Sequence, residues 1–163
     1  MLPLTEGKLS LDAAKASADV WDFERLVTQI ETEAASVTAS RRAQLTQDLL
    51  RLYAGHFLDP ESQETWAVAA RDKHRSKFTR SVSLLGAALE RNGEWEQATG
   101  LYARALELDN LAEPIYRRLM ICYREMREPA EALNTYRRCR DMLSIVLNAK
   151  PAAETEAIRV TLG

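Results

Sequence analysis

This chain is poor in the residues that interrupt or cross-link a backbone. Its 163 residues include only six glycines, five prolines and two cysteines, and aromatic residues make up 7%. Few glycines and prolines favour long helices, and two cysteines are too few for a disulfide-rich scaffold. Cys122 and Cys139 lack the spacing of metal ligands, so we expect both to be buried, reduced thiols. The sequence predicts no metal and no other cofactor.

Long apolar runs and a strong charge of one sign are also missing. No apolar run approaches the length of a membrane-spanning helix, and no basic segment followed by an apolar one resembles a secretory signal. The formal net charge of -2 gives no overall attraction to nucleic acid. Hydrophobic residues at 46% and charged residues at 28% are typical of a domain with a real core. We therefore expect a cytoplasmic protein without a membrane segment.

The chain does contain an internal repeat, in which small and aromatic residues recur with a period of 34 residues. This is the tetratricopeptide period, in which each unit is a pair of antiparallel helices. We therefore predict an all-α, tetratricopeptide-like, right-handed helical solenoid of antiparallel helix pairs. The residues expected at the packing positions are Gly86, Ala98, Tyr102 and Ala105 in the first unit and Met120, Ala132, Tyr136 and Cys139 in the second.

Apolar spacing predicts the remaining helices. One begins at Asp19, a candidate N-cap, and another ends at Gly55. A long helix follows over about residues 66–92, and Gly86 lies within it. A short helix over about residues 154–162 would cap the solenoid, because an end unit has no further neighbour to cover it.

Six segments carry a family pattern in the same order along the chain. They are residues 19–26, 52–58, 66–71, 106–120, 131–136 and 150–155. Together they resemble the bacterial transcriptional activator domain of antibiotic-regulatory-protein-type regulators, over roughly residues 19–163. The chain departs from the family at Asn110, Arg127 and Asn148, where a proline or a glycine is usual. Asparagine tolerates the left-handed conformation that a glycine would take, so the helix end at Asn148 can survive.

The resemblance implies a helical domain that directly follows a winged helix-turn-helix DNA-binding domain. The segment from Leu4 to Leu11 is typical of a short β-hairpin, and the resemblance would make it the wing of that domain. We therefore expect residues 1–14 to be the tail of a missing winged-helix domain. Residues 15–163 would be the tetratricopeptide-like activator domain, and DNA would be bound only through the missing domain.

The expected role is contact with proteins, by dimerisation, by relay of a signal to an attached DNA-binding domain, or by contact with RNA polymerase. A free-standing tetratricopeptide adaptor without a transcriptional role is the alternative. In either case an acidic partner would suit the arginines of two neighbouring helices. The candidate partner-binding residues are Arg117, Arg118, Arg124, Arg137, Arg138 and Arg140.

Direct binding of nucleic acid by this chain is a further alternative. The candidate phosphate-contact residues are Arg71, Lys73, Arg75 and Lys77. On a helix Arg71 and Arg75 share one side, whereas Lys73 and Lys77 share another that is nearly opposite. Because this spacing divides the charge between two sides, it favours a solvated helix with ion pairs between residues one turn apart.

Catalysis and small-molecule binding have weaker support. His56 lies near Asp59 and Glu61 and could act as a base, but no evident nucleophile accompanies it. No glycine-rich phosphate loop, His-Glu-x-x-His or Cys-x-x-Cys motif is present, so we expect no enzyme. A groove lined by tyrosines could hold a ligand, yet two of them occupy repeat packing positions. The four tyrosines are Tyr102, Tyr116, Tyr123 and Tyr136.

Overall fold

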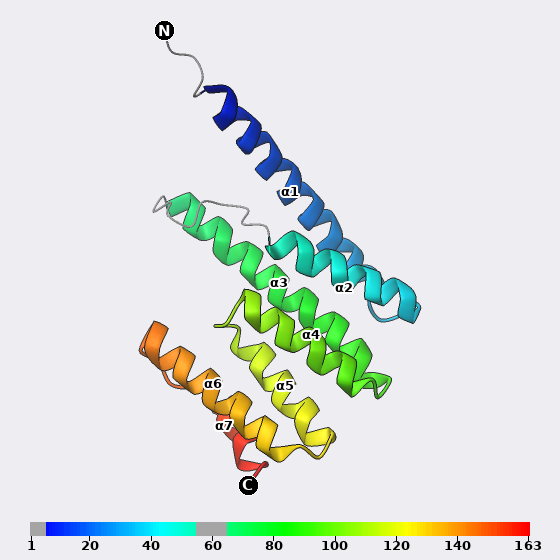
Figure 1. Cartoon of the computed structure of the whole chain (residues 1–163), viewed down its shortest axis with the longest axis vertical. Coiled ribbons are helices and arrows are strands. Elements are labelled where there is room, and N and C mark those ends of the chain that lie inside the picture. The colour runs from blue at the N-terminus through cyan, green and yellow to red at the C-terminus, as the bar shows by residue number, and fades with distance from the viewer. Residues whose placement is uncertain (1–5, 55–64) are drawn as a thin grey trace. The chain divides into compact units, whose positions relative to one another are not determined.

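The chain is all-α. The computed structural model describes residues 6–54 and 65–163, and every regular element in these two ranges is a helix (Figure 1). The chain divides into two compact units, Met1–Phe78 and Thr79–Gly163, with the boundary inside the third helix. The helices are α1 (Glu6–Glu33), α2 (Ala39–Ala54), α3 (Thr65–Arg91), α4 (Trp95–Leu108), α5 (Glu113–Glu125), α6 (Pro129–Leu147) and α7 (Ala153–Val160).

In the first unit, α1 and α2 form a helix pair that packs with the first half of α3. Phe23 of α1 and Leu45 and Leu49 of α2 are fully buried. The ring of Tyr53 stacks on the buried ring of Phe78, with centroids 3.7 Å apart and an angle of 5° between the planes. The described part of this unit therefore has a core of its own, built at helical spacing as the sequence predicts.

The prediction of a β-hairpin over Leu4 to Leu11 is wrong for those residues of the segment that the structure describes. Helix α1 already begins at Glu6 and runs without a break to Glu33, so Asp19 lies within the helix and is not its N-cap. A lone pair of strands is marginal in water. Four alanines between residues 13 and 18 favour the helix instead.

The second unit contains the repeat. The second half of α3 pairs with α4, α5 pairs with α6, and α7 packs against both α5 and α6 (Figure 1). Val82 and Leu89 are buried in α3 at the positions where the repeat usually has large aromatic residues. Tyr102 and Ala98 of α4 are fully buried, as is Ala132 of α6. The paired helices of the tetratricopeptide fold are therefore present, as the period predicts.

The turns between helices repeat as well. Gly93 has a φ of 73°, and Arg127, which follows it at the repeat distance, has a φ of 61°. Both residues therefore place the backbone in the left-handed region, although only the first is a glycine. Asn148 ends α6 with a φ of 49°, and its backbone N–H donates to the carbonyl oxygen of Ser144. Asn148 therefore takes the conformation that asparagine tolerates, and the helix ends there without a glycine.

Candidate protein-interaction surface

The side chain of Glu90 joins three helices of the second unit. The Tyr102 hydroxyl of α4 donates a 2.5 Å hydrogen bond to Glu90 Oε1 of α3. Arg118 Nη1 of α5 donates to Glu90 Oε2 at 2.9 Å. The Glu90 side chain is only 11% exposed, and burial raises the pKa of Tyr102 far above its usual range. Arg118 therefore balances a carboxylate that the repeat holds close to its core.

Glu113 plays a similar role at the C-terminal end of the unit. Its Oε1 accepts hydrogen bonds from the backbone N–H of Ala152 at 2.7 Å and from the Thr155 hydroxyl at 2.6 Å. Arg117 Nη1 donates to the same hydroxyl oxygen at 3.2 Å and lies 3.8 Å from Glu113 Oε1. Thr155 is fully buried. Glu113 and Arg117 thus attach the short helix α7 to α5.

Helix α7 is also tied to α6. The Tyr136 hydroxyl donates to Glu156 Oε1, and Arg159 lies over the Tyr136 ring at 5.6 Å from its centroid. The hydrogen bond from Tyr136 lowers the pKa of Glu156, with a further contribution from Arg159. Tyr102 and Tyr136 occupy equivalent positions of the two repeat units but donate to different acceptors. The residue equivalent to Glu90 in the second unit is Arg124, so Tyr136 donates to Glu156 of α7 instead.

The six arginines of the candidate partner-binding surface divide into two kinds. Arg117 and Arg118 of α5 are half-buried and hold neighbouring helices, as described above. Arg124 donates to the Glu125 carboxylate and to the Thr161 hydroxyl, so it too makes contacts within the unit. The remaining three lie exposed on α6 and are Arg137, Arg138 and Arg140.

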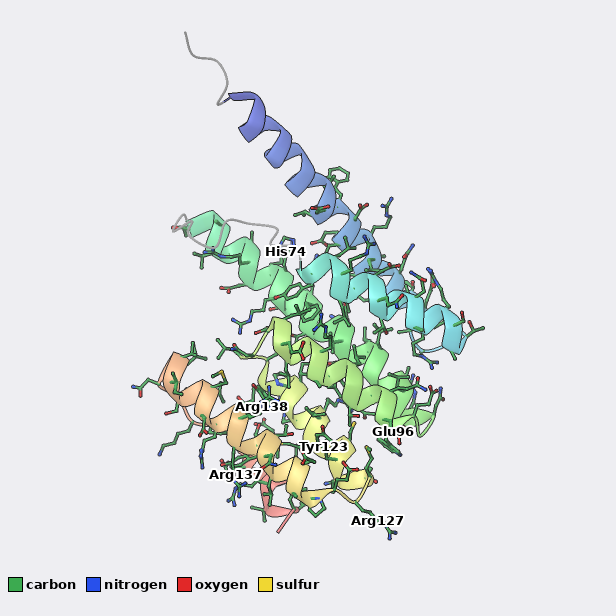
Figure 2. All side chains as sticks on the ribbon, viewed as in Figure 1. His74, Glu96, Tyr123, Arg127, Arg137 and Arg138 are labelled. Carbon is green, nitrogen blue, oxygen red and sulfur yellow. The ribbon has the colours of Figure 1, made fainter. Side chains whose placement is uncertain are left out.

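The three arginines of α6 do not share one face. Successive helical residues are rotated by about 100°, so Arg137 and Arg138, which are neighbours on α6 (Figure 2), point in different directions. Arg137 donates to the side-chain oxygen of Asn134 at 3.1 Å, and Arg140 donates to Asp141 at 2.8 Å. Arg138 instead lines a hollow beside α4 and α5.

The candidate phosphate-contact residues all lie in the first half of α3. Lys77 pairs with Glu24 of α1, and His74 Nε2 lies 3.6 Å from the same carboxylate. Burial lowers the pKa of His74, against an opposing effect of Glu24. Because Lys77 pairs with a glutamate, its charge is partly balanced within the unit. Lys73 is exposed, whereas Arg71 and Arg75 are half-buried.

The four tyrosines considered as ligand contacts are largely interior. Tyr102, Tyr116 and Tyr136 are buried, and each hydroxyl donates within the unit; Tyr116 bonds to the backbone oxygen of Asn110 at 3.0 Å. Tyr123, labelled in Figure 2, is half-buried, and burial raises its pKa. Tyr116 also borders the hollow that Arg138 lines.

Three features of the structure had no clear signal in the sequence. They are the glutamates that join helices, Glu90 and Glu113, and the hollow at Arg138. A second hollow of about 450 Å³ lies beside Trp95 and Met126, at the turns that end α3 and α5. The 34-residue comparison could have exposed Glu90 and Arg124 as equivalent positions of opposite charge, which is a hint that their partners differ.

Four further expectations from the sequence concern catalysis, metal binding, membrane insertion and the cysteines. His56, Asp59 and Glu61 lie outside the described residues. Within residues 6–54 and 65–163, no cluster of three or more His, Cys, Asp or Glu side chains could hold a metal ion. In the same part of the chain, no helix has both the length and the apolar character needed to cross a membrane. Cys122 and Cys139 are both buried and free.

Comparisons with known proteins cover most of the chain. The family model of the bacterial transcriptional activator domain matches residues 18–162. Among curated proteins, none gives a significant match to the sequence. A solved structure of a mutant of MamA is similar at 13% identity, covering 89% of this chain and 86% of that one, with a TM-score of 0.41.

Proposed function

The chain belongs to the bacterial transcriptional activator domain family, and from this membership we propose that it is the protein-contact module of a bacterial transcriptional regulator. The observation that carries the proposal is the family match, which spans both the helix pair of the first unit and the repeat of the second. Transcriptional regulation is the role of the family, and catalysis is not part of our proposal.

The contact itself takes one of three forms in this proposal: dimerisation, relay to an attached DNA-binding domain, or binding to RNA polymerase. The cross-helix bonds support all three forms. Glu90 joins α3, α4 and α5, and Glu113 joins α5 to α7. These bonds hold the second unit rigid, so its outer residues keep a constant geometry. Fewer side chains and loops then have to be ordered on binding, which lowers the entropic cost.

DNA enters the proposal only through a separate winged-helix domain of the same regulator. Lys77 of α3 is engaged with Glu24, which supports a minor role for the candidate phosphate-contact residues. We place the protein in the cytoplasm, where RNA polymerase acts.

Biolayer interferometry tests the proposal. The purified chain is immobilised and exposed to RNA polymerase holoenzyme, with random duplex DNA as the control, and light scattering measures self-association in parallel. Binding to polymerase or self-association is expected, with no binding to DNA. Salt-sensitive binding to DNA alone, with neither protein contact, would contradict the proposal and return attention to Arg71, Lys73, Arg75 and Lys77.

A further inference from the structure

The last turn of α6 exposes large apolar side chains next to one another. Ile145 is 77% exposed, Val146 52% and Leu147 55%. Single exposed apolar residues are ordinary, whereas a contiguous group on a folded surface marks a contact site. Of these three, Ile145 lies on the same side of α6 as Met142, so exposed apolar surface continues from it toward the middle of the helix.

One face of α6 connects this apolar end to the hollow at Arg138. Arg138, Met142 and Ile145 follow each other at intervals of four and three residues, so they lie within about 60° of one another around the helix. We call these three residues the α6 strip; it is about 10 Å long. Arg138 and Met142 line the hollow, which has a volume of about 360 Å³ and is bordered on the other side by Leu106 and Tyr116.

The charge of the hollow is unbalanced at Arg138. Asp141, which also lines it, accepts two hydrogen bonds from Arg140, and Glu107 pairs with Arg104. Among the described residues, Arg138 has neither an ion pair nor a hydrogen bond. Its guanidinium therefore offers donors to a carboxylate from outside, at the edge of an apolar surface.

We propose that the α6 strip binds a short amphipathic helix of a partner protein, with a carboxylate of that helix on Arg138 and its apolar side chains on Met142 and Ile145. The spacing of the strip matches the ridge of apolar residues on a helix, at intervals of three and four. The hollow beside Leu106 and Tyr116 receives one apolar side chain. This inference rests on the proposed function, because it names the surface and the chemistry of the protein contact.

Fluorescence anisotropy with a defined peptide tests the strip. The probe is a labelled helical peptide with leucines at intervals of three and four residues and one glutamate a turn before the central leucine. Its control peptide has lysine in place of that glutamate. The full chain should bind the glutamate peptide saturably, with a Kd on the order of 10–100 µM for so small a contact. The lysine peptide should bind roughly tenfold more weakly.

Matched variants locate the contact. Arg138→Glu and Ile145→Ser should each weaken the glutamate peptide roughly tenfold. Arg137→Glu makes the same charge change about 100° away on the helix, and Leu147→Ser removes an equally apolar side chain about 160° from Ile145 around the helix. Both controls should bind within about twofold of the unchanged chain. The lysine peptide should regain affinity for Arg138→Glu, because the charges are then exchanged.

Several results would overturn the inference. They are no saturable binding of the glutamate peptide, equal effects of Arg137→Glu and Arg138→Glu, and no recovery in the charge exchange. Binding of duplex DNA that is lost in Arg138→Glu would assign the strip to phosphate and also overturn it.

The inference and the proposed function can fail separately. If the chain binds RNA polymerase or itself equally well with Arg138→Glu and Ile145→Ser, the strip is not the contact while the proposed function stands. If the chain binds neither protein but the peptide still binds in a manner that depends on Arg138, the strip stands while two of the proposed contacts, dimerisation and polymerase binding, fail.

Discussion

Gly86 of α3 lies directly against the Tyr102 side chain of α4. A Cβ atom at Gly86 would be 2.0 Å from the Tyr102 hydroxyl oxygen and 2.2 Å from the carbon that carries it. The same hydroxyl donates to Glu90, one turn further along α3. The missing side chain of Gly86 therefore sets both the distance between the two helices and the position of the hydrogen-bond donor.

Gly86→Leu should destabilise the chain by about 1–3 kcal/mol, because it overpacks the contact with a buried ring. Gly86→Ala should act in the same direction. The matched control is Gly100→Ala, at an exposed helical glycine of α4 with no heavy atom within 4 Å of the added Cβ. This control should stabilise by up to about 1 kcal/mol, since alanine is the better helix former. Urea unfolding followed by circular dichroism measures all three variants, and a Gly86→Leu curve like that of the unchanged chain would refute the packing described here.

The left-handed backbone at Arg127 predicts a stabilising substitution. Arg127 has a φ of 61°, which costs roughly 1–2 kcal/mol for a residue with a side chain. Arg127→Gly should therefore stabilise the chain by about 0.5–1 kcal/mol, after the greater freedom of glycine in the unfolded state is subtracted. Gly93→Ala, the opposite change at the equivalent turn, should destabilise by a similar amount. Thermal unfolding checks both, and equal melting temperatures for the two variants would contradict the prediction.

Loss of Glu113 should free α7 and leave the other helices folded. Glu113→Ala removes the acceptor of two hydrogen bonds, from Ala152 and Thr155, and leaves the buried Thr155 hydroxyl with Arg117 as its partner. Hydrogen exchange should show faster exchange of the amides in Ala153–Val160 with little change in α4. Glu154→Ala is the control, because Glu154 is an exposed carboxylate in the first turn of the same helix. Faster exchange throughout the second unit would mean that Glu113 supports the whole unit.

Both cysteines should be inert while the chain is folded. Cys122 and Cys139 are fully buried, and burial raises the pKa of each thiol to about 12. Because the thiolate is the reactive form, neither should react with Ellman's reagent in buffer at neutral pH. Both should react at once in concentrated denaturant, which serves as the control. Reaction of either thiol in the folded state would mean that α5 or α6 opens locally.

The buried His74 predicts a loss of stability in mild acid. Burial lowers the pKa of His74 below its usual value, so the unfolded chain binds a proton more readily than the folded one. The free energy of unfolding should therefore be highest above about pH 6.5 and fall as the pH drops from there through the folded-state pKa. Urea unfolding at about pH 7.5 and 5.5 measures this difference. His74→Asn should reduce the difference, and an unchanged difference in this variant would contradict the prediction.

Much of the fold could be predicted from local patterns. The 34-residue period identified the helix pairs of the second unit, and apolar spacing placed α3 within a residue or two of its ends. Asn148 in the left-handed region could also be predicted, because that conformation depends on the residue itself. The hairpin at Leu4 to Leu11 could not, because alternation over so few residues does not decide between a strand and the start of a long helix.

The candidate site was predicted less well. The sequence grouped six arginines by type, but the partners of Arg117 and Arg118 are Thr155 and Glu90, which lie 38 and 28 residues away along the chain. Such pairs form only when helices pack, so no local pattern contains them. The α6 strip was missed for a related reason, since the exposure of Ile145 depends on which neighbours cover it.

The amino-acid sequence by itself determined the helices, their repeat and the membership of a family of transcriptional regulators, because these depend on spacing along the chain and on residue types. Only the tertiary structure decided which charged side chains are paired within the protein and which remain available to a partner. Glu90 of α3 engages Arg118 of α5, and Arg117 of α5 reaches Thr155 of α7, whereas Arg138 keeps its charge at the edge of an apolar surface. The physical reason is that an ion pair depends on distance in space, and packing brings together residues that the chain keeps far apart.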